Sequence, residues 1–174
     1  MTELTSLKNH FLVAMPSLDD PYFSRSLIYV CEHDSEGAMG IVVNQPSTMN
    51  VKQLLEQTDK ELTVSDDKAE EIVLAGGPVS QERGFVLHST QKGWASSLAL
   101  APGVMVTTSK DILTAIGNDE GPDDAIIALG FAGWKKGQLE QEMQENAWLT
   151  IEADEEILFH TPIHKKWQAT VNKL

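Results

Sequence analysis

The chain has a single cysteine, Cys31, among its 174 residues. One cysteine excludes a disulfide bond within the chain, so the fold cannot depend on a crosslink of that kind. Disulfides are rare in the reducing cytosol and common in secreted proteins. The cysteine content therefore predicts a cytoplasmic protein.

Long hydrophobic stretches are also missing. The uninterrupted apolar runs are only a handful of residues long, whereas a helix that crosses a bilayer needs about 20 apolar residues. The first residues carry an acid, Glu3, and have no basic flank leading into an apolar stretch, so we expect no signal peptide. These absences predict that the chain has no membrane partner.

Basic residues are few. Lysine and arginine number 13 against 26 aspartates and glutamates, which gives a net charge of −13. A chain this acidic is repelled by nucleic-acid phosphates and by anionic lipid. The sequence also shows no helix-turn-helix with a basic recognition helix, so direct binding of nucleic acid is not expected.

The rest of the composition is that of a folded protein. Apolar residues make up 41% of the chain and charged residues 22%, values that are normal for a globular domain and too apolar for a disordered one. The length fits one ordinary domain. Because no repeat or linker divides the sequence, we expect a single domain over residues 1–174.

The clearest local pattern is a β-hairpin. Two apolar runs, 26–32 and 38–44, flank the polar turn 34–37, and such a pair of runs around a short turn is typical of two antiparallel strands. The pattern predicts that the hairpin lies in the core of a sheet, with Cys31 opposite Gly40 in the adjacent strand.

Other elements follow from apolar periodicity and turn residues. We expect further strands at 11–15, 72–75, 85–88, 104–107, 125–129 and 148–152. Helices are expected at 51–57, after a capping box at 108–111, at 138–146 and at 163–174, and a loop at 59–71. The apolar stripe of the last helix predicts that it docks through Ile163 and Trp167. Strands in consecutive groups with few helices between them favour an α+β fold over a doubly wound parallel sheet.

Six motifs stand in a fixed order along the chain: FLVAMPSLDDPYFSRS from Phe11, CEHDSEGAMG from Cys31, AGGPV from Ala75, RGFVLH from Arg83, TSKDIL from Thr108 and GFAGWKKGQLEQE from Gly130. Together they resemble the YqgE/AlgH family of bacterial proteins, over almost the whole chain. The resemblance implies a single α+β domain of bent, mostly antiparallel β-sheets with a few flanking helices. It also implies a regulatory role, and it supplies no catalytic residues.

Cys31 and His33 form the first candidate site, a reactive thiol. Strand alternation places both side chains on one face, and opposite Gly40 the sulfur would be open to solvent. A protonated His33 would lower the pKa of the thiol and favour the reactive thiolate. The alternative is that Cys31 is a small buried hydrophobic residue, as free cysteines commonly are.

Metal binding is a weaker possibility for the same region. Cys31, His33 and His88 are side chains of the types that bind zinc, but the chain has neither a CxxC nor an HExxH motif. We therefore expect no metal site and no other cofactor.

A second candidate site lies between residues 76 and 88. Gly76 and Gly77 follow an apolar strand, so their amides could cradle a small anion that Arg83 and His88 would help to neutralise. Pro78 removes one amide donor, and no complete phosphate-binding motif is present. The alternative is a tight glycine turn, with Arg83 paired to an acid.

Trp134 is the third candidate. The segment 130–134 is expected to join a buried strand to the helix at 138–146, with its glycines allowing a tight turn. Trp134 either covers the core or stacks on a ligand.

No catalytic set is assembled by these patterns, because the strongest motifs consist mainly of glycine, proline and apolar residues. The sequence therefore favours a non-enzymatic regulatory or protein-interaction domain with an unidentified protein partner. A thiol-based redox sensor or enzyme using Cys31 is the first alternative. A small-anion binder at 76–88 is the second.

Overall fold

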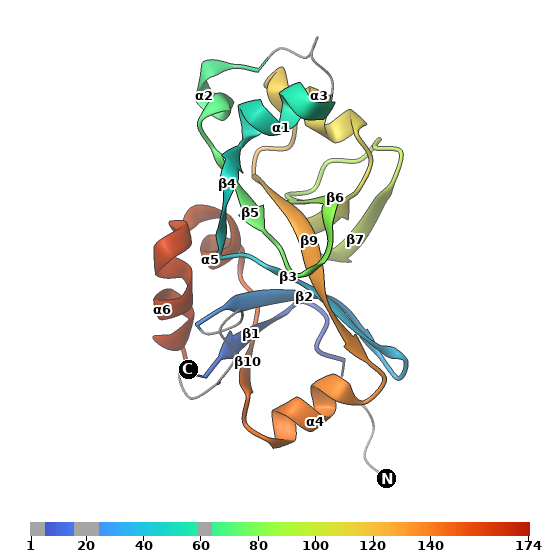
Figure 1. Cartoon of the computed structure of the whole chain (residues 1–174), viewed down its shortest axis with the longest axis vertical. Coiled ribbons are helices and arrows are strands. Elements are labelled where there is room, and N and C mark those ends of the chain that lie inside the picture. The colour runs from blue at the N-terminus through green and yellow to red at the C-terminus, as the bar shows by residue number, and fades with distance from the viewer. Residues whose placement is uncertain (1–5, 16–24, 59–63) are drawn as a thin grey trace.

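A computed structural model describes residues 6–15, 25–58 and 64–174, and it shows a strongly bent β-sheet with helices at its ends and along one side (Figure 1). The strands are β1 (His10–Ala14), β2 (Leu27–Asp34), β3 (Gly37–Val42), β4 (Pro46–Asn50), β5 (Ile72–Ala75), β6 (Val79–His88), β7 (Ser97–Ala101), β8 (Val104–Thr107), β9 (Ala125–Lys135) and β10 (Trp148–Glu152). The helices are α1 (Val51–Thr58), α2 (Asp66–Ala69), α3 (Asp111–Gly117), α4 (Gln138–Gln144), α5 (Glu155–His160), a 3-10 turn η1 (Ile163–Lys165) and α6 (Lys166–Val171).

The strand order is β10-β1-β2-β3-β9-β6-β8-β7, with β4 and β5 attached beside β9. Neighbouring strands are antiparallel except for β5 and β9, which are parallel. The predicted α+β class with mostly antiparallel, bent sheets is therefore confirmed. No helix in the described ranges is long and apolar enough to cross a membrane.

Strand β9 connects the two halves of the sheet. Its first part pairs with β5 and β6, and its last part, from Ala132 to Lys135, pairs with β3. Between the two parts Gly130 has a φ of +81°, a left-handed conformation that favours glycine. In Figure 1 this strand runs through the middle of the molecule from one half to the other. The bend of the sheet is therefore made inside β9.

The described residues form three apolar clusters around the bent sheet. One lies between the two halves and is covered by α5 and α6, with Tyr29 and Phe85 among its members. A second lies between α4 and the strands β1, β2, β3, β9 and β10, around Trp134 and Trp148. The third lies under α1 and α3. Both faces of β2 are buried for this reason: its residues alternate between the first cluster and the second.

The predicted hairpin is present, with one difference in register. Strands β2 and β3 pair antiparallel, but the partner of Gly40 is Val30, because a β-bulge lies between Val30 and Glu32. Cys31 sits in this bulge. Its expected position directly opposite Gly40 was wrong, although the two residues are in adjacent strands. The extra residue of a bulge reverses the facing of every side chain that follows it.

Two other segments differ from expectation. The segment from Gly130 to Trp134 continues the strand β9 and does not form a turn into a helix, since its backbone pairs with β3 and with Val79. The polar stretch 59–71, expected as a loop, contains the helix α2, and its residues 59–63 lie outside the described ranges. Strands β4 and β7 and the helix α5 were not expected.

The helix after the predicted capping box begins at Asp111, but no side chain caps it in the expected manner. The N-cap residue is Lys110, which makes no side-chain cap hydrogen bond. Instead, the Asp111 carboxylate accepts hydrogen bonds from Ser109 Oγ and from the backbone amide of Ala95. These bonds and that of Ile112 N lower the pKa of Asp111, and they tie α3 to the segment before β7.

The C-terminal segment docks on the core as predicted, but through an additional residue. Ile163 and Trp167 are half-buried against the first cluster, and the Trp167 indole donates a hydrogen bond of 3.1 Å to Ala14 O. The most buried side chains of the segment, however, are Lys166 and Thr170. Lys166 lies three residues after Ile163, which puts it on the same helix face.

Candidate functional site

The Cys31 thiol is buried at the bulge of β2, with only 2% of the residue exposed. Its sulfur lies 3.9 Å from Tyr29 O, to which it can donate a weak hydrogen bond. Burial and, to a smaller extent, the Glu32 carboxylate raise the pKa of Cys31 to about 12 against a lowering effect of Lys8. Gly40 does not expose the sulfur, because a Cβ atom built on Gly40 would meet Ile28 on the other face of the hairpin.

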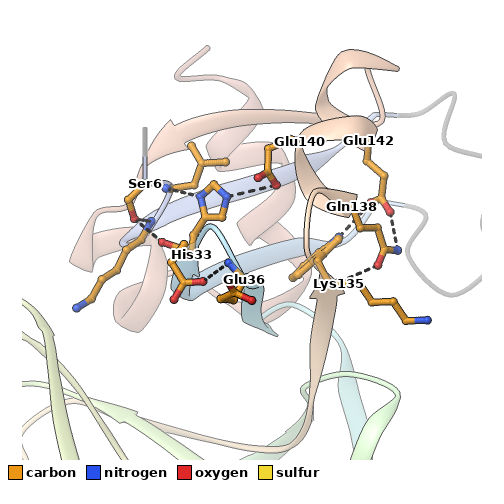
Figure 2. Close-up of polar contacts among 11 residues, drawn as sticks. Ser6, His33, Glu36, Lys135, Gln138, Glu140 and Glu142 are labelled. Atoms are coloured by element: carbon orange, nitrogen blue, oxygen red, sulfur yellow. Dashed lines mark hydrogen bonds and ion pairs between the residues drawn. The ribbon is translucent and has the colours of Figure 1, made fainter. Parts of the chain in front are cut away.

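His33 does not act on this thiol. The bulge turns its side chain to the face of Ala38 and Leu7, opposite to the cluster that holds Cys31. There Nδ1 accepts a hydrogen bond of 2.9 Å from Leu7 N, and Nε2 lies 3.5 Å from Glu140 Oε1 of α4 (Figure 2). His33 therefore connects the N-terminal segment to α4, and the expected pairing of Cys31 with His33 was wrong.

Gly76 and Gly77 are packed against β9. The Gly76 amide donates to Leu129 O and its carbonyl accepts from Val42 N, each at 2.8 Å. A Cβ atom on Gly76 would overlap Gly130 O, and one on Gly77 would overlap the backbone of Phe131. Glycine is thus required by the close approach of two backbones, and the Gly76 amide is not available to an anion.

His88 and Arg83 lie apart from these glycines and from each other. His88 ends β6 opposite Ala125, whereas Gly76 bonds to Leu129, so four residues of β9 separate them, roughly 13 Å at the usual rise of a strand. Burial lowers the pKa of His88, partly offset by its hydrogen bond to Ser89 O, so the imidazole is neutral at pH 7. The structure does not bring the predicted anion site together.

Trp134 lies in the second apolar cluster and is 7% exposed. Its indole packs edge-on against that of Trp148, with ring centroids 6.2 Å apart. Both indole N–H groups donate to Glu142 Oε1 of α4, at 3.0 and 2.8 Å. This arrangement satisfies the two buried donors and supports the core role of Trp134 over ligand stacking.

A cavity of about 290 Å³ lies beside strand β7 and is called the β7 pocket below. Its lining is Cys31, Glu32, Met39, Arg83, Phe85, Ser96, Ser97, Leu98, Val106, Thr108 and Phe131. The Arg83 guanidinium lies 5.5 Å from the centre of the Phe85 ring, a favourable cation–π distance. No ion pair joins Arg83 to a carboxylate in the described part of the chain. The pocket is therefore apolar inside and carries a cation that is open to an anionic group.

The sequence did not indicate the β7 pocket. It named Arg83 and Cys31 for other reasons, and the strand that forms the rim, with Leu98, was not expected at all. The run Ser-Leu-Ala-Leu-Ala has alternation but no β-branched or aromatic residue, so the usual strand signal is weak. Across the described residues no group of three histidine, cysteine or acidic side chains is placed to hold a metal ion.

Comparison with known proteins settles the relationship of the chain. The model of the AlgH-like family matches residues 11–174. The chain belongs to the AlgH-like family. Among the curated relatives of this AlgH-like chain is the UPF0301 protein YE3428 of Yersinia enterocolitica, 53% identical over 97% of this chain and 92% of the relative. A UPF0301 protein of Shewanella sp. (strain ANA-3) is 54% identical over 95% of this chain and 89% of its own.

Two solved structures share the fold. The solution structure of the AlgH protein from Pseudomonas aeruginosa is 41% identical and superimposes with a TM-score of 0.85, covering 99% of this chain and 90% of that one. The crystal structure of a protein from Corynebacterium diphtheriae gives a TM-score of 0.75 at 21% identity, over 100% and 90% of the two chains. At that identity the second likeness concerns the fold alone.

The thiol of this AlgH-like chain is expected to resist labelling. A pKa of about 12 against the ordinary 9 leaves roughly a thousandth of the usual thiolate at mildly alkaline pH. We expect iodoacetamide at pH 8 to modify Cys31 at least 100-fold more slowly in the folded chain than in urea, followed by intact mass. Equal rates in the two states would restore the reactive-thiol hypothesis.

Proposed function

We propose that the chain is a non-enzymatic, regulatory protein-interaction domain that works in the cytoplasm and binds its partner at strand β7 and the β7 pocket. The observation that carries this proposal is an exposed leucine on an edge strand, directly beside an apolar pocket. Family membership is consistent with a regulatory role, and the burial and raised pKa of Cys31 give no support to thiol chemistry.

Strand β7 ends the strand order and pairs with β8 on one side. An edge strand of this kind offers backbone N–H and C=O groups to an added strand of a partner. Leu98 in its middle is 46% exposed, whereas Leu100, two residues on, is buried. Association with a partner would bury this large apolar side chain. Each Å² of apolar surface removed from water contributes about 25 cal/mol of favourable free energy.

The distribution of charge around the β7 pocket indicates which kind of partner segment would bind there. The chain carries a net charge of −13, so an acidic partner is repelled by most of its surface. Arg83 places a cation at the pocket, next to the apolar side chains of Phe85 and Leu98. We infer that the partner presents an extended segment with an apolar side chain close to a carboxylate. An anionic group is thus still part of the proposal, at Arg83 and away from Gly76.

The test is a comparison of two edge-strand variants in a pull-down from bacterial lysate, with the captured proteins identified by mass spectrometry. Leu98→Glu places a charge in the proposed contact. Leu149→Glu places the same charge on β10, the opposite edge, at a leucine that is 40% exposed. We expect the specifically captured proteins to be lost, by tenfold or more, with Leu98→Glu and kept with Leu149→Glu.

Unchanged capture by Leu98→Glu would remove β7 as the binding edge. Equal loss in both variants would point to a general effect of added charge and would also count against the proposal. Circular dichroism of the two variants, which should match the wild type because both leucines are exposed, checks that neither change unfolds the chain.

A further inference from the structure

Three side chains on the adjacent strands β6, β8 and β7 form a continuous hydrogen-bonded chain, called the hydroxyl relay below. His88 Nε2 lies 2.7 Å from Thr107 Oγ1, and Thr107 Oγ1 lies 2.6 Å from Ser97 Oγ. On its other side, His88 Nδ1 lies 2.7 Å from Ser89 O. The register places Thr107 opposite Ser97 and next to Val86, so the three strands hold the relay in line.

The positions of the protons follow from the end of the relay. Ser89 O is a carbonyl oxygen and can only accept, so Nδ1 of the neutral imidazole carries the proton and Nε2 presents its lone pair. Thr107 must then donate its hydroxyl proton to Nε2. Its oxygen is left as an acceptor, so the proton in the 2.6 Å contact belongs to Ser97. Every proton of the relay therefore points from Ser97 toward the base.

The two ends of the relay differ in their access to solvent. His88 and Thr107 are 0% exposed, whereas Ser97 is exposed on the edge strand and is one of the residues that line the β7 pocket. Because burial keeps the imidazole neutral, it is a proton acceptor at pH 7. A buried base connected through one hydroxyl to an exposed serine is an arrangement that activates a nucleophile.

We propose that Ser97 is a nucleophile that accepts an acyl group from an activated ester, with His88 as the base acting through Thr107. Ser97 Oγ forms a bond to the carbonyl carbon, and the bond from that carbon to the leaving oxygen breaks. The Ser97 proton passes to Thr107 as the Thr107 proton passes to His88 Nε2. The imidazolium then returns a proton from Nε2 to Thr107, whose hydroxyl gives its own proton to the leaving oxygen. The products are acyl-Ser97 and the free alcohol, so the chain itself is modified and no turnover is implied. This chemistry does not depend on the binding of a protein partner.

The charged groups near His88 do not change its assignment as a neutral base. Asp124, whose backbone carbonyl accepts from Ser89, lies in the segment that adjoins His88, and its carboxylate pairs with His160 Nε2 at 3.0 Å. The causes of the lowered pKa of His88 are its burial and the opposing hydrogen bond to Ser89, with no contribution from a charged side chain. The rate of acylation should therefore fall as the pH drops through a value below 6.5.

The test uses a fluorophosphonate probe, which mimics an activated acyl group and releases fluoride when a serine oxygen bonds to its phosphorus. The whole chain is incubated with the probe, and the adduct is located by peptide mass spectrometry. We expect labelling at Ser97 and none at Ser65, a half-buried serine whose hydroxyl is bonded to Asp119 Oδ1 and has no imidazole behind it. Ser97→Ala should abolish the adduct.

The role of the relay is tested by two changes at Thr107. Thr107→Val keeps the shape but removes the hydroxyl, and we expect it to slow labelling at least tenfold and to remove the pH inflection. Thr107→Ser keeps the hydroxyl and should restore both. An unlabelled Ser97 in the wild type would overturn the proposal, as would equal rates for wild type and Thr107→Val. If Thr107→Val does not fold, the pH profile of the wild type decides, because a rate without an inflection below pH 6.5 excludes His88 as the base.

Discussion

Replacing Gly130 with alanine is expected to lower the free energy of unfolding by about 3 kcal/mol or more. The left-handed φ of +81° costs an alanine about 1 kcal/mol. In addition, the new Cβ would overlap Gly77 O and lie 3.1 Å from Val79 O, and forcing atoms into a packed region costs about 2 kcal/mol. Urea unfolding followed by circular dichroism measures the sum.

Gly137 provides the matched control for this change. Its φ is +77°, almost the same as that of Gly130, but a Cβ atom there would meet nothing within 4 Å. Gly137→Ala should therefore cost only the backbone contribution, about 1 kcal/mol. The difference between the two variants isolates the close contact between β9 and the segment 76–79. Equal losses of unfolding free energy in the two variants would show that the backbone around Gly130 moves to accept the new Cβ at no cost.

Lys166→Met is expected to change the pH dependence of stability more than the stability at pH 7. Lys166 Nζ donates to Val43 O at 3.1 Å and to Leu158 O at 2.9 Å, and no carboxylate pairs with it in the described residues. Burial lowers its pKa from 10.5 to about 8. The two carbonyls match the two N–H groups of a neutral amine, whereas an ammonium has a third.

The sign of the effect follows from proton binding. Between pH 8 and pH 10.5 the unfolded chain keeps the Lys166 proton and the folded chain has lost it, so this residue makes stability rise with pH across that window. The rise amounts to about 3 kcal/mol for a shift of this size. Below pH 8 both states are protonated and the contribution stays at its low level.

The measurement is the difference in unfolding free energy between wild type and Lys166→Met at pH 7 and at pH 10. At pH 7 the loss of two hydrogen bonds and the removal of a buried charge offset each other within about 2 kcal/mol. At pH 10 the variant should be about 3 kcal/mol less stable, relative to wild type, than at pH 7. Cys31 and Tyr29, whose raised pKa values act in the opposite direction, cancel in the difference. A difference that does not change with pH would contradict the assignment.

The elements that the sequence predicted correctly have strong local signals. The hairpin 26–44 and the strands at 72–75, 104–107 and 148–152 combine β-branched or aromatic residues with clear turns. The bulge after Val30 could not be foreseen, because an extra residue in one strand depends on how the partner strand pairs with it. That single residue separates His33 from Cys31 and removes the predicted thiol pair.

The predicted anion site failed for a related reason. Arg83 and His88 are close in sequence, but both belong to the extended strand β6, where five residues span roughly 17 Å. The sequence gives only one sign that Lys166 is buried and Lys165 is not. The spacing of Ile163 and Trp167 places Lys166 on the docked face of the helix. The β7 pocket and the hydroxyl relay depend on contacts between three strands, so no local pattern could indicate them.

The continuity of β9 has a consequence for how the molecule opens. Its residues pair with β6 along the first half and with β3 along the second, so each half of the sheet is held by backbone hydrogen bonds to the same strand. The two halves should therefore melt in one cooperative transition. The amides of β9 that donate to these ladders should exchange with deuterated water only through global unfolding, at rates common to both halves.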